Sequence, residues 1–393
     1  MKKKLLAHVI VSQGYHVHKS VSGGPRMQPW VENVNRFLRA EGYKVCVFTC
    51  GENRVSFTKS NIDTVVSKRL GILKDPFSFD IVIRAFLSKK PSVVVIHGLQ
   101  HLLTFFSLIT YSLRRIPIIV IVHGLYRHES RSLLLRDRLL RYLLLLLKGY
   151  TVIVLTDYDR QVVLNKWKLC PEIVKVTNVF LYLNSDELSE INKVAKRDSE
   201  YIRRASEKTS FLYVGRLVHD QKRVDHLVEI FHRFLQNTKN KYRNVELVLL
   251  GSGPLRGTLE KMVRDFALQD YVRIVGAVSD EEKWLHYLSS TAVVSVSEFE
   301  GLPRVIFEAL ASGKIVIAPD ICGLGEVIHD GVNGFLFRSD EEFINILECL
   351  AANRHRLDIM QKNIHESNVA KFEADANKEE MCIIIRQCAE RHD

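Results

Sequence analysis

The chain has 393 residues, of which 47% are hydrophobic and 26% are charged, as in a folded globular protein of two or three domains. Its apolar runs are too short, and too often interrupted by arginine, to span a bilayer, and its first residues show a strand pattern rather than a signal peptide. Seven cysteines without a Cys-x-x-Cys pair argue against a disulfide framework and a structural zinc site. We therefore expect a protein of the cytoplasm.

The charge of the chain is unevenly distributed. Residues 1–180 hold 28 Lys and Arg against 11 Asp and Glu, a net charge of +17, whereas residues 181–393 hold 28 against 34, a net charge of −6. A basic half of this size indicates an anionic partner, either nucleic acid or an acidic membrane surface. The basic residues are not interleaved with a platform of aromatic residues, so we expect no nucleic acid partner.

Apolar runs typical of strands alternate with helical patterns along the first half. The expected strands and helices are, in chain order, LLAHVIVS, a helix over 29–41, KVCVFTC, a helix before Pro91, SVVVIHG, a helix ending near Arg115, IPIIVIVHG, a leucine-rich helix and TVIVLT. Alternation of this kind predicts a parallel sheet with helices on both of its faces.

The leucine-rich segment 127–148 carries its basic residues within about one quadrant of a helix. These residues are Arg127, Arg131, Arg138, Arg141 and Lys148. Such a helix is typical of one that lies at a membrane interface, and the basic half of the chain favours this interpretation. The alternative is a mostly buried domain helix with one solvated basic stripe, because leucine-rich helices are also ordinary core elements.

A charged stretch, 185–209, has few strand signals and separates the first alternating series from a second one that begins at Phe211. We therefore place the domain boundary here, with domains at 1–184 and 185–363. The last segment, 364–393, is helical in pattern.

The segment 297–337 is the most informative part of the second half. Glu300 and Gly301 follow the strand pattern TAVVSVS, and Pro303 suits the first turn of a helix, which predicts a helix that starts near Leu302 and carries Glu308 about two turns along. The free N–H groups of that helix favour a phosphate group. The run IVIA then predicts a buried parallel strand, followed by a glycine loop that contains Gly323.

These residues resemble the retaining GT-B glycosyltransferases of family 4, which carry a Glu-x7-Glu motif like Glu300 and Glu308. The resemblance continues through FLYVGRLVHDQKRVDHLV, LVLLGSGPL, VRIVG and HDGVNGFLF, and covers residues 210–337. It implies two doubly wound Rossmann-like α/β domains that face a cleft, with the last helix crossing back onto the N-terminal domain. It also implies that Glu308 holds the ribose hydroxyls of the nucleotide and that Glu300 lies near the donor sugar.

The same resemblance assigns roles to further residues. Arg216 and Lys222 would neutralise the diphosphate, and His123, which ends the strand of VIVHG, would touch the donor sugar. The catalytic set is therefore His123, Arg216, Lys222 and Glu300. The positions expected to bind the donor are Gly23, Gly24, Gly215, Gly253, Gly276, Gly301, Leu302, Glu308 and Gly323.

Each feature also has a structural explanation when taken alone. Two glutamates eight residues apart are often solvated, Arg216 and Lys222 are often surface charges, and Gly23 and Gly24 form an ordinary tight turn in the simplest interpretation. His97 ends the preceding strand and is expected to be structural. The chain has Thr177-Asn178-Val179 where the family commonly has Pro-Asn-Gly, which puts the linker and the acceptor side in doubt.

The function expected from these features is metal-independent transfer of a hexose, with retention, from a UDP- or GDP-sugar to a lipid-linked or growing saccharide acceptor. No further cofactor is expected. The enzyme would lie at the inner face of an anionic membrane. The alternatives are a catalytically silent membrane scaffold that binds sugar nucleotides and a GT-B sugar-nucleotide epimerase. A nicotinamide dehydrogenase is disfavoured, because the first strand is not followed by GxGxxG and an acidic residue about 20 positions on.

Overall fold

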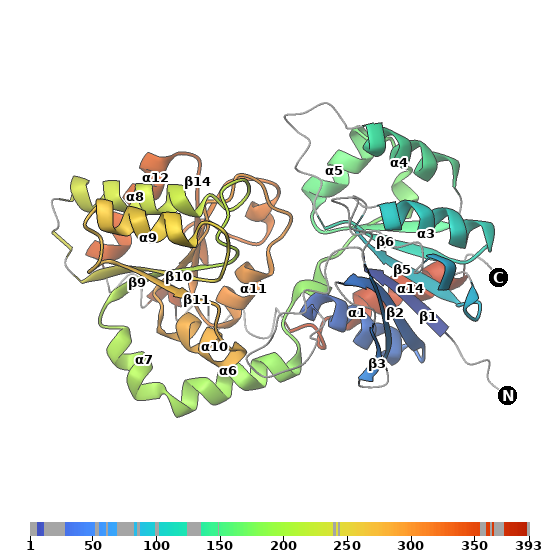
Figure 1. Cartoon of the computed structure of the whole chain (residues 1–393), viewed down its shortest axis with the longest axis horizontal. Helices are drawn as coiled ribbons and strands as arrows, with labels where there is room; N and C mark the ends of the chain where they lie inside the picture. Colours follow the sequence, from blue (N-terminus) through green and yellow to red (C-terminus); the bar gives the residue numbers. More distant parts are fainter. Residues whose placement is uncertain are drawn as a thin grey trace. The chain divides into compact units, whose positions relative to one another are not determined.

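The chain folds into two compact units (Figure 1). The computed structural model describes residues 6–11, 28–51, 55–59, 62–68, 82–84, 87–98, 102–123, 135–147, 149–238, 241–242, 244–353, 359–361, 364 and 373–390. Unit 1 comprises Met1–Leu181 and Ala376–Asp393, and unit 2 comprises Tyr182–Asp375. The chain thus passes from one unit to the other at 181/182 and at 375/376, whereas the boundaries expected from the sequence lie at 184/185 and 363/364.

Unit 1 is built on an eight-stranded sheet of order β3-β4-β2-β1-β5-β6-β7-β8. Its strands are β1 (Leu6–Val11), β2 (Lys44–Gly51), β3 (Val55–Lys59), β4 (Ile62–Lys68), β5 (Val93–His97), β6 (Ile118–Ile121), β7 (Tyr150–Val154) and β8 (Val174–Val176). Its described helices are α1 (Pro29–Ala40), α3 (Leu102–Leu113), α4 (Leu135–Leu146), α5 (Asp157–Asn165) and α14 (Lys378–Glu390), with short 3-10 turns at Pro171–Ile173 and Val179–Leu181.

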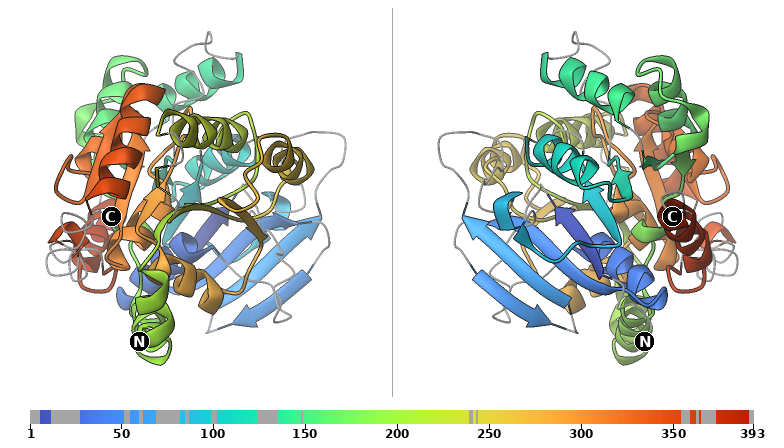
Figure 2. Two further views of the ribbon diagram at one scale, coloured as in Figure 1. Left: turned by 90° about the vertical axis from the view of Figure 1, so that its left-hand side faces the viewer. Right: turned by 90° about the vertical axis from the view of Figure 1, so that its right-hand side faces the viewer.

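The pairings of this sheet are parallel with one departure from the prediction. Strand β3 pairs with β4 in the antiparallel sense, whereas β4 pairs with β2 in parallel, and the three strands lie side by side in Figure 2. Neither strand was predicted, because both lack the continuous apolar runs of the central strands.

Helices cover both faces of the unit 1 sheet, as predicted. Every residue of β5, β6 and β7 is buried, which explains why these strands are continuous apolar runs. On one face, Val94, Ile96 and Val120 pack with Leu103 and Leu108 of α3. Helix α14, from the end of the chain, contacts α1, β5 and β6.

Unit 2 contains a six-stranded parallel sheet of order β11-β10-β9-β12-β13-β14. The strands are β9 (Thr209–Val214), β10 (Val245–Leu250), β11 (Val272–Gly276), β12 (Ala292–Val294), β13 (Ile315–Pro319) and β14 (Gly334–Phe337). The helices are α6 (Ser185–Arg197), α7 (Ser199–Ala205), α8 (Val224–Asn237), α9 (Arg256–Asp265), α10 (Asp280–Ser289), α11 (Arg304–Ala311) and α12 (Asp340–Ala352), with a 3-10 turn at Leu324–Glu326.

The strand order of unit 2 determines where a ligand can bind. Counted within the unit, the strands run 3-2-1-4-5-6, which is the order of a dinucleotide-binding Rossmann sheet. Helices α8, α9 and α12 cover one face, and α10 and α11 cover the other (Figure 1). The order reverses between β9 and β12, so the crevice for a ligand is expected outside the carboxyl ends of these two strands.

Candidate functional site

The loop after β9 contains Gly215, Arg216 and Lys222, and the loop after β12 contains Glu300. These loops leave the two strands at which the order of the sheet reverses. The Lys222 ammonium forms an ion pair with the Glu300 carboxylate, and the two side chains are 16% and 7% exposed. The structure therefore brings together two residues, 78 positions apart, that the sequence assigned to the same site.

Gln221 extends this contact between the loops. Its side-chain amide donates to Glu300 Oε2 at 3.3 Å, its side-chain oxygen accepts from Arg216 Nη2 at 2.8 Å, and its backbone carbonyl accepts from the Glu298 N–H at 3.0 Å. Sequence reasoning passed over Gln221 because a glutamine beside a lysine carries no distinctive pattern. These contacts hold Arg216 and Lys222 at the carboxyl edge of the sheet.

Glycines allow the neighbouring loops to approach closely. A Cβ atom on Gly251, whose φ is +144°, would lie 1.8 Å from the Gly215 carbonyl oxygen, and one on Gly253 would lie 2.3 Å from the Leu217 carbonyl oxygen. Backbone hydrogen bonds from Leu217 N to Ser252 O (3.0 Å) and from Gly251 N to Gly276 O (2.8 Å) join the loops. Gly253 and Gly215 were assigned to the donor. Backbone packing requires glycine at Gly253 and at Gly251, which the sequence did not single out, whereas a Cβ on Gly215 would lie 2.9 Å from the Tyr213 hydroxyl oxygen.

Two further predicted glycines end strands of the unit 2 sheet or follow them. Gly276 is the last residue of β11, with φ +97°, and a Cβ there would lie 2.7 Å from Arg256 Nη1. Gly323 follows β13 and has φ +77°. Both positions favour glycine for its backbone conformation.

Helix α11 begins at Arg304, so the predicted start near Leu302 is wrong by two residues. Pro303 is the N-cap and has an extended conformation (φ −71°, ψ 131°). Leu302 precedes the proline, whose ring disfavours helical geometry at that position. Its side chain is buried, so a donor contact at Leu302 or Gly301 would involve the backbone.

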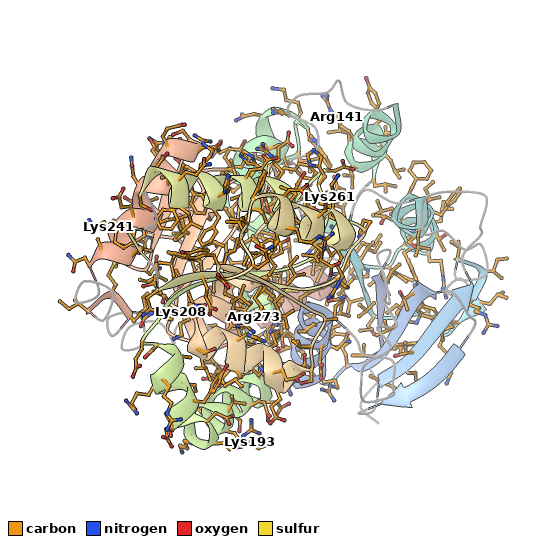
Figure 3. The ribbon with its side chains drawn as sticks, turned by 60° about the vertical axis from the view of Figure 1, so that its left-hand side comes forward. Arg141, Lys193, Lys208, Lys241, Lys261 and Arg273 are labelled. Carbon is orange, nitrogen blue, oxygen red and sulfur yellow. The ribbon has the colours of Figure 1, made fainter. Side chains whose placement is uncertain are left out.

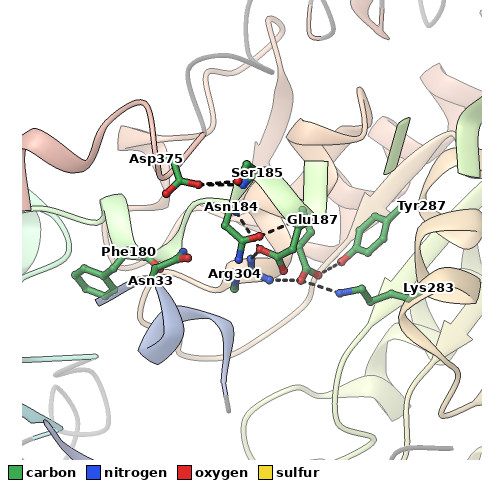
Figure 4. Close-up of polar contacts among 10 residues, drawn as sticks. Asn33, Phe180, Asn184, Ser185, Glu187, Lys283, Tyr287, Arg304 and Asp375 are labelled. Atoms are coloured by element: carbon green, nitrogen blue, oxygen red, sulfur yellow. Dashed lines mark hydrogen bonds and ion pairs between the residues drawn. The ribbon is translucent and has the colours of Figure 1, made fainter. Parts of the chain in front are cut away.

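Glu308 lies in the second turn of α11, where it is 6% exposed. Its Oε1 accepts from Lys283 Nζ at 3.1 Å and from Arg304 Nη1 at 2.7 Å, and its Oε2 accepts from the Tyr287 hydroxyl at 2.8 Å. The three donor residues, Arg304, Lys283 and Tyr287, are labelled in Figure 4. Burial raises the pKa of Glu308, but Lys283, Arg304 and the Tyr287 hydrogen bond outweigh it and lower the pKa below its ordinary value. Glu308 is therefore an ionised carboxylate in a fixed orientation.

Arg304 also contacts a residue that the sequence did not single out. Its Nη2 donates to Glu187 Oε2 at 2.5 Å, and the two side chains are 11% and 18% exposed. Glu187 lies in the first turn of α6, 117 residues before Arg304. A separation of this length leaves no local signal in the sequence.

In unit 1, His123 contacts His97. His97 Nδ1 and His123 Nε2 are 3.0 Å apart, and the Trp30 ring lies 4.7 Å and 4.4 Å from the two imidazoles, centroid to centroid. Burial lowers the pKa of His123 to about 4 and that of His97 well below its ordinary value, so both rings are neutral near pH 7. His97 ends β5 and His123 lies two residues beyond its parallel neighbour β6, which explains their contact. Gly23 and Gly24 lie outside the described residues.

The leucine-rich segment contains α4, from Leu135 to Leu146. Tyr142, Leu145 and Leu146 are 62%, 44% and 80% exposed, whereas Leu144 is fully buried. Arg141 lies on the same helix (Figure 3). Arg127, Arg131 and Lys148 lie outside the described residues, as does the side chain of Arg138. Among the described helices, none is long and apolar enough to cross a membrane.

Within the part of the chain that the structure describes, no group of three His, Cys, Asp or Glu side chains is suited to hold a metal ion. The prediction of metal independence took the chain to lack an Asp-x-Asp pattern, which is wrong, because residues 157–159 are Asp-Tyr-Asp. In the structure this triplet opens α5, and Asp159 exchanges hydrogen bonds with the N-cap Thr156.

Two family models match this chain, one in each of its two units. A family model described as glycosyl transferases group 1 matches residues 195–367, and one described as glycosyltransferase family 4 matches residues 27–178. An uncharacterized glycosyltransferase of Haemophilus influenzae is 26% identical over 332 residues, which is 82% of this chain and 85% of that protein. The alpha-D-kanosaminyltransferase of Streptomyces kanamyceticus is 28% identical over 244 residues, 61% of each chain.

Other relatives act in the synthesis of polysaccharides and glycolipids. Among solved structures, that of HepE from Anabaena in complex with UDP matches this chain with a TM-score of 0.70 and 16% identity, covering 98% of this chain and 100% of that chain. At this level of identity the similarity is one of fold.

Proposed function

Because the chain belongs to the GT-B glycosyltransferases of the family 4 type, we propose that it transfers a hexose, with retention, from a UDP- or GDP-sugar to a saccharide acceptor in glycan or glycoconjugate assembly. The observation that carries this proposal is the Lys222–Glu300 ion pair at the reversal point of a Rossmann sheet, in the same unit as the buried, ionised Glu308. The UDP bound by HepE supports a nucleoside diphosphate donor.

We assign the donor groups to residues by their chemistry. Glu308 accepts hydrogen bonds from the ribose hydroxyls, which suits a carboxylate that is held ionised. Arg216 and Lys222 face the diphosphate, whose negative charge competes with Glu300 for the Lys222 ammonium. Glu300 then lies near the sugar. His123 contributes a neutral imidazole to the sugar, because its pKa is about 4.

The reaction breaks the bond between the anomeric carbon and the diphosphate oxygen and forms a bond from that carbon to the acceptor oxygen. Negative charge develops on the departing diphosphate, and fixed cations stabilise it without having to reorganise. In the front-face route that we favour, the departing phosphate takes the acceptor proton. The charges of Arg216 and Lys222 make a divalent metal unnecessary in this scheme.

For the acceptor we propose a lipid-linked saccharide at an anionic membrane surface, on the cytoplasmic side. The support is the net charge of +17 on residues 1–180 and the exposed Tyr142, Leu145 and Leu146 on α4. Sedimentation with vesicles that contain 30% phosphatidylglycerol tests this part. We expect binding that is weakened by salt and by Leu146→Ser, and binding that is equal on neutral vesicles would contradict it.

The donor site is tested by calorimetric titration with UDP-, GDP- and ADP-sugars. We expect one nucleotide class to bind to the wild type and its affinity to fall at least 10-fold in Glu308→Ala, because a buried acceptor is lost. Lys222→Ala should lower the transfer rate about 100-fold, as loss of one charge-stabilising donor does.

Lys261→Ala is the matched control, since Lys261 is an exposed lysine of the same unit on α9 (Figure 3). It should leave both measurements unchanged. Failure of every nucleotide sugar to bind would refute the proposed function, and a trapped glycosyl-enzyme would refute the front-face route.

A further inference from the structure

The chain crosses between the units twice, and the unit 2 residues that border the two crossings contact each other. Ala374 N donates to Leu183 O at 2.8 Å, and Ser185 N and Oγ lie 3.2 Å and 3.0 Å from Asp375 Oδ2 (Figure 4). We name Leu183, Ser185, Ala374 and Asp375 the crossover clasp. The chain leaves unit 2 immediately beyond these residues, at 181/182 and 375/376. The clasp therefore holds together the two points of unit 2 at which the chain crosses.

Helix α6 begins within the clasp and ends its first turn at Glu187. Asn184 is its N-cap and forms a capping box with Glu187: Glu187 N donates to Asn184 Oδ1 at 3.0 Å, and Asn184 N donates to Glu187 Oε2 at 3.1 Å. The same Oε2 accepts from Arg304 Nη2. The position of the Glu187 carboxylate therefore depends on the backbone that forms the clasp.

Arg304 carries this contact to Glu308. One guanidinium nitrogen, Nη2, bonds Glu187 and the other, Nη1, bonds Glu308 Oε1 at 2.7 Å, so a planar fork joins two carboxylates on α6 and α11. The three side chains are 11%, 18% and 8% exposed. Little water is available to replace these bonds, so breaking one of them is costly, unlike at an exposed ion pair.

The capacity of Glu308 to accept hydrogen bonds is nearly filled. An ionised carboxylate has about four acceptor positions, and Lys283, Arg304 and Tyr287 occupy three of them. A ligand hydroxyl must use what is left on Oε2 or displace one of these donors. A ligand hydroxyl on Oε2 shares the charge of the carboxylate and so weakens its bond to Arg304, and displacement of Arg304 breaks that bond.

We propose that Arg304 is a positioning residue that couples nucleotide binding at Glu308 to the crossover clasp through Glu187. The inference rests on the proposed function, because it takes Glu308 as the acceptor for the ribose hydroxyls. Binding of the nucleotide changes the stability of the clasp, and the clasp changes nucleotide affinity by the same factor, since coupling between two sites is reciprocal.

The variants Glu187→Gln and Arg304→Lys separate coupling from folding. Glutamine still accepts the Asn184 N–H, so the capping box remains while the charge that holds Arg304 is lost. Lysine keeps the positive charge of Arg304 but lacks the planar fork that reaches two carboxylates. Arg233→Met is the control, because Arg233 also joins two carboxylates in unit 2, Asp340 and Glu341 of α12, at 2.8 Å and 2.7 Å.

The experiment measures the affinity for UDP and GDP by calorimetry and the exchange of the Ser185 and Ala374 amides, both donors in the clasp, with and without nucleotide. We expect the nucleotide to slow exchange of these amides in the wild type and in Arg233→Met. In Glu187→Gln and Arg304→Lys this effect should be lost, and the dissociation constant should rise about 10-fold, within the range measured for coupled sites. A merely structural role would change exchange equally with and without nucleotide.

A double-mutant cycle completes the test. In a Glu308→Gln background, Glu187→Gln should cause no further loss of affinity, because its effect passes through Glu308. Additive losses, or wild-type affinity and wild-type protection in both single variants, would overturn the inference while leaving the proposed function intact. A wild-type protein that binds neither UDP nor GDP would overturn both.

Discussion

Substitution of Gly251 by alanine tests whether the close approach of the β9 and β10 loops is required for the donor site. The added Cβ would lie 1.8 Å from the Gly215 carbonyl oxygen, and contacts under 3.0 Å essentially do not occur, so the two loops must separate by about 1.2 Å. Two backbone hydrogen bonds span this region, from Gly215 N to Leu250 O (2.9 Å) and from Gly251 N to Gly276 O (2.8 Å).

The cost follows from these distances. The φ of +144° strains any residue with a Cβ, at about 1 to 3 kcal/mol. Loss of one buried backbone bond adds about 1 to 3 kcal/mol. We therefore expect Gly251→Ala to lower the free energy of unfolding by about 4 kcal/mol, a large share of the roughly 5 to 15 kcal/mol of a typical domain.

Urea unfolding followed by circular dichroism measures this loss, and calorimetric titration with UDP measures its effect on the site. Gly257→Ala is the matched control: a Cβ at Gly257, in α9, meets nothing within 4 Å. That variant should be more stable than the wild type by about 0.5 to 1 kcal/mol, because alanine favours a helix. Equal urea midpoints for the two variants would refute the reasoning.

Three further predictions concern other parts of the molecule. Tyr287→Phe removes the hydroxyl that donates to Glu308 and leaves a buried acceptor unsatisfied. The free energy of unfolding should therefore fall by about 1 to 3 kcal/mol, and the affinity for UDP should fall as well. If neither value changes, this hydrogen bond does not orient the carboxylate. Burial, with a smaller effect of Arg114, lowers the pKa of His8 from 6.5 to about 4, so the unfolded chain binds its proton first and stability falls as the pH drops from 6.5 to 4. The free energy of unfolding from urea titrations should be lower at pH 5 than at pH 7 by about 2 kcal/mol on account of His8. His8→Asn should remove this part of the pH dependence. Ile385 of α14 is fully buried, so Ile385→Ala should lower the free energy of unfolding by about 2 to 5 kcal/mol. Ile383 is 42% exposed, so Ile383→Ala should lower it by under about 1 kcal/mol. Equal losses would show that α14 is not part of the unit 1 core.

The strands and helices of the core, and the loops that follow them, could be predicted from the local sequence pattern. Continuous apolar runs such as VVVIH and IVIAP predicted strands buried on both faces, and alternation with helical segments predicted the doubly wound sheets that the structure contains. Departures occurred where local pattern is weak or misleading. The β3–β4 hairpin lacks continuous apolar runs, and Pro303, which predicted a helix start near Leu302, is itself the extended N-cap of α11.

What the tertiary structure alone decided is which groups surround the predicted residues. The spacing of Glu300 and Glu308 was visible in the sequence, but Lys283, Tyr287 and Glu187 reach Arg304 or Glu308 from separations of 21 to 117 residues. The requirement for glycine at Gly251 likewise comes from a carbonyl on the neighbouring strand's loop. Local patterns reflect the hydrophobic periodicity and backbone preferences of one segment, whereas the orientation of a buried carboxylate depends on donors that only the packing of distant helices brings within hydrogen-bond distance.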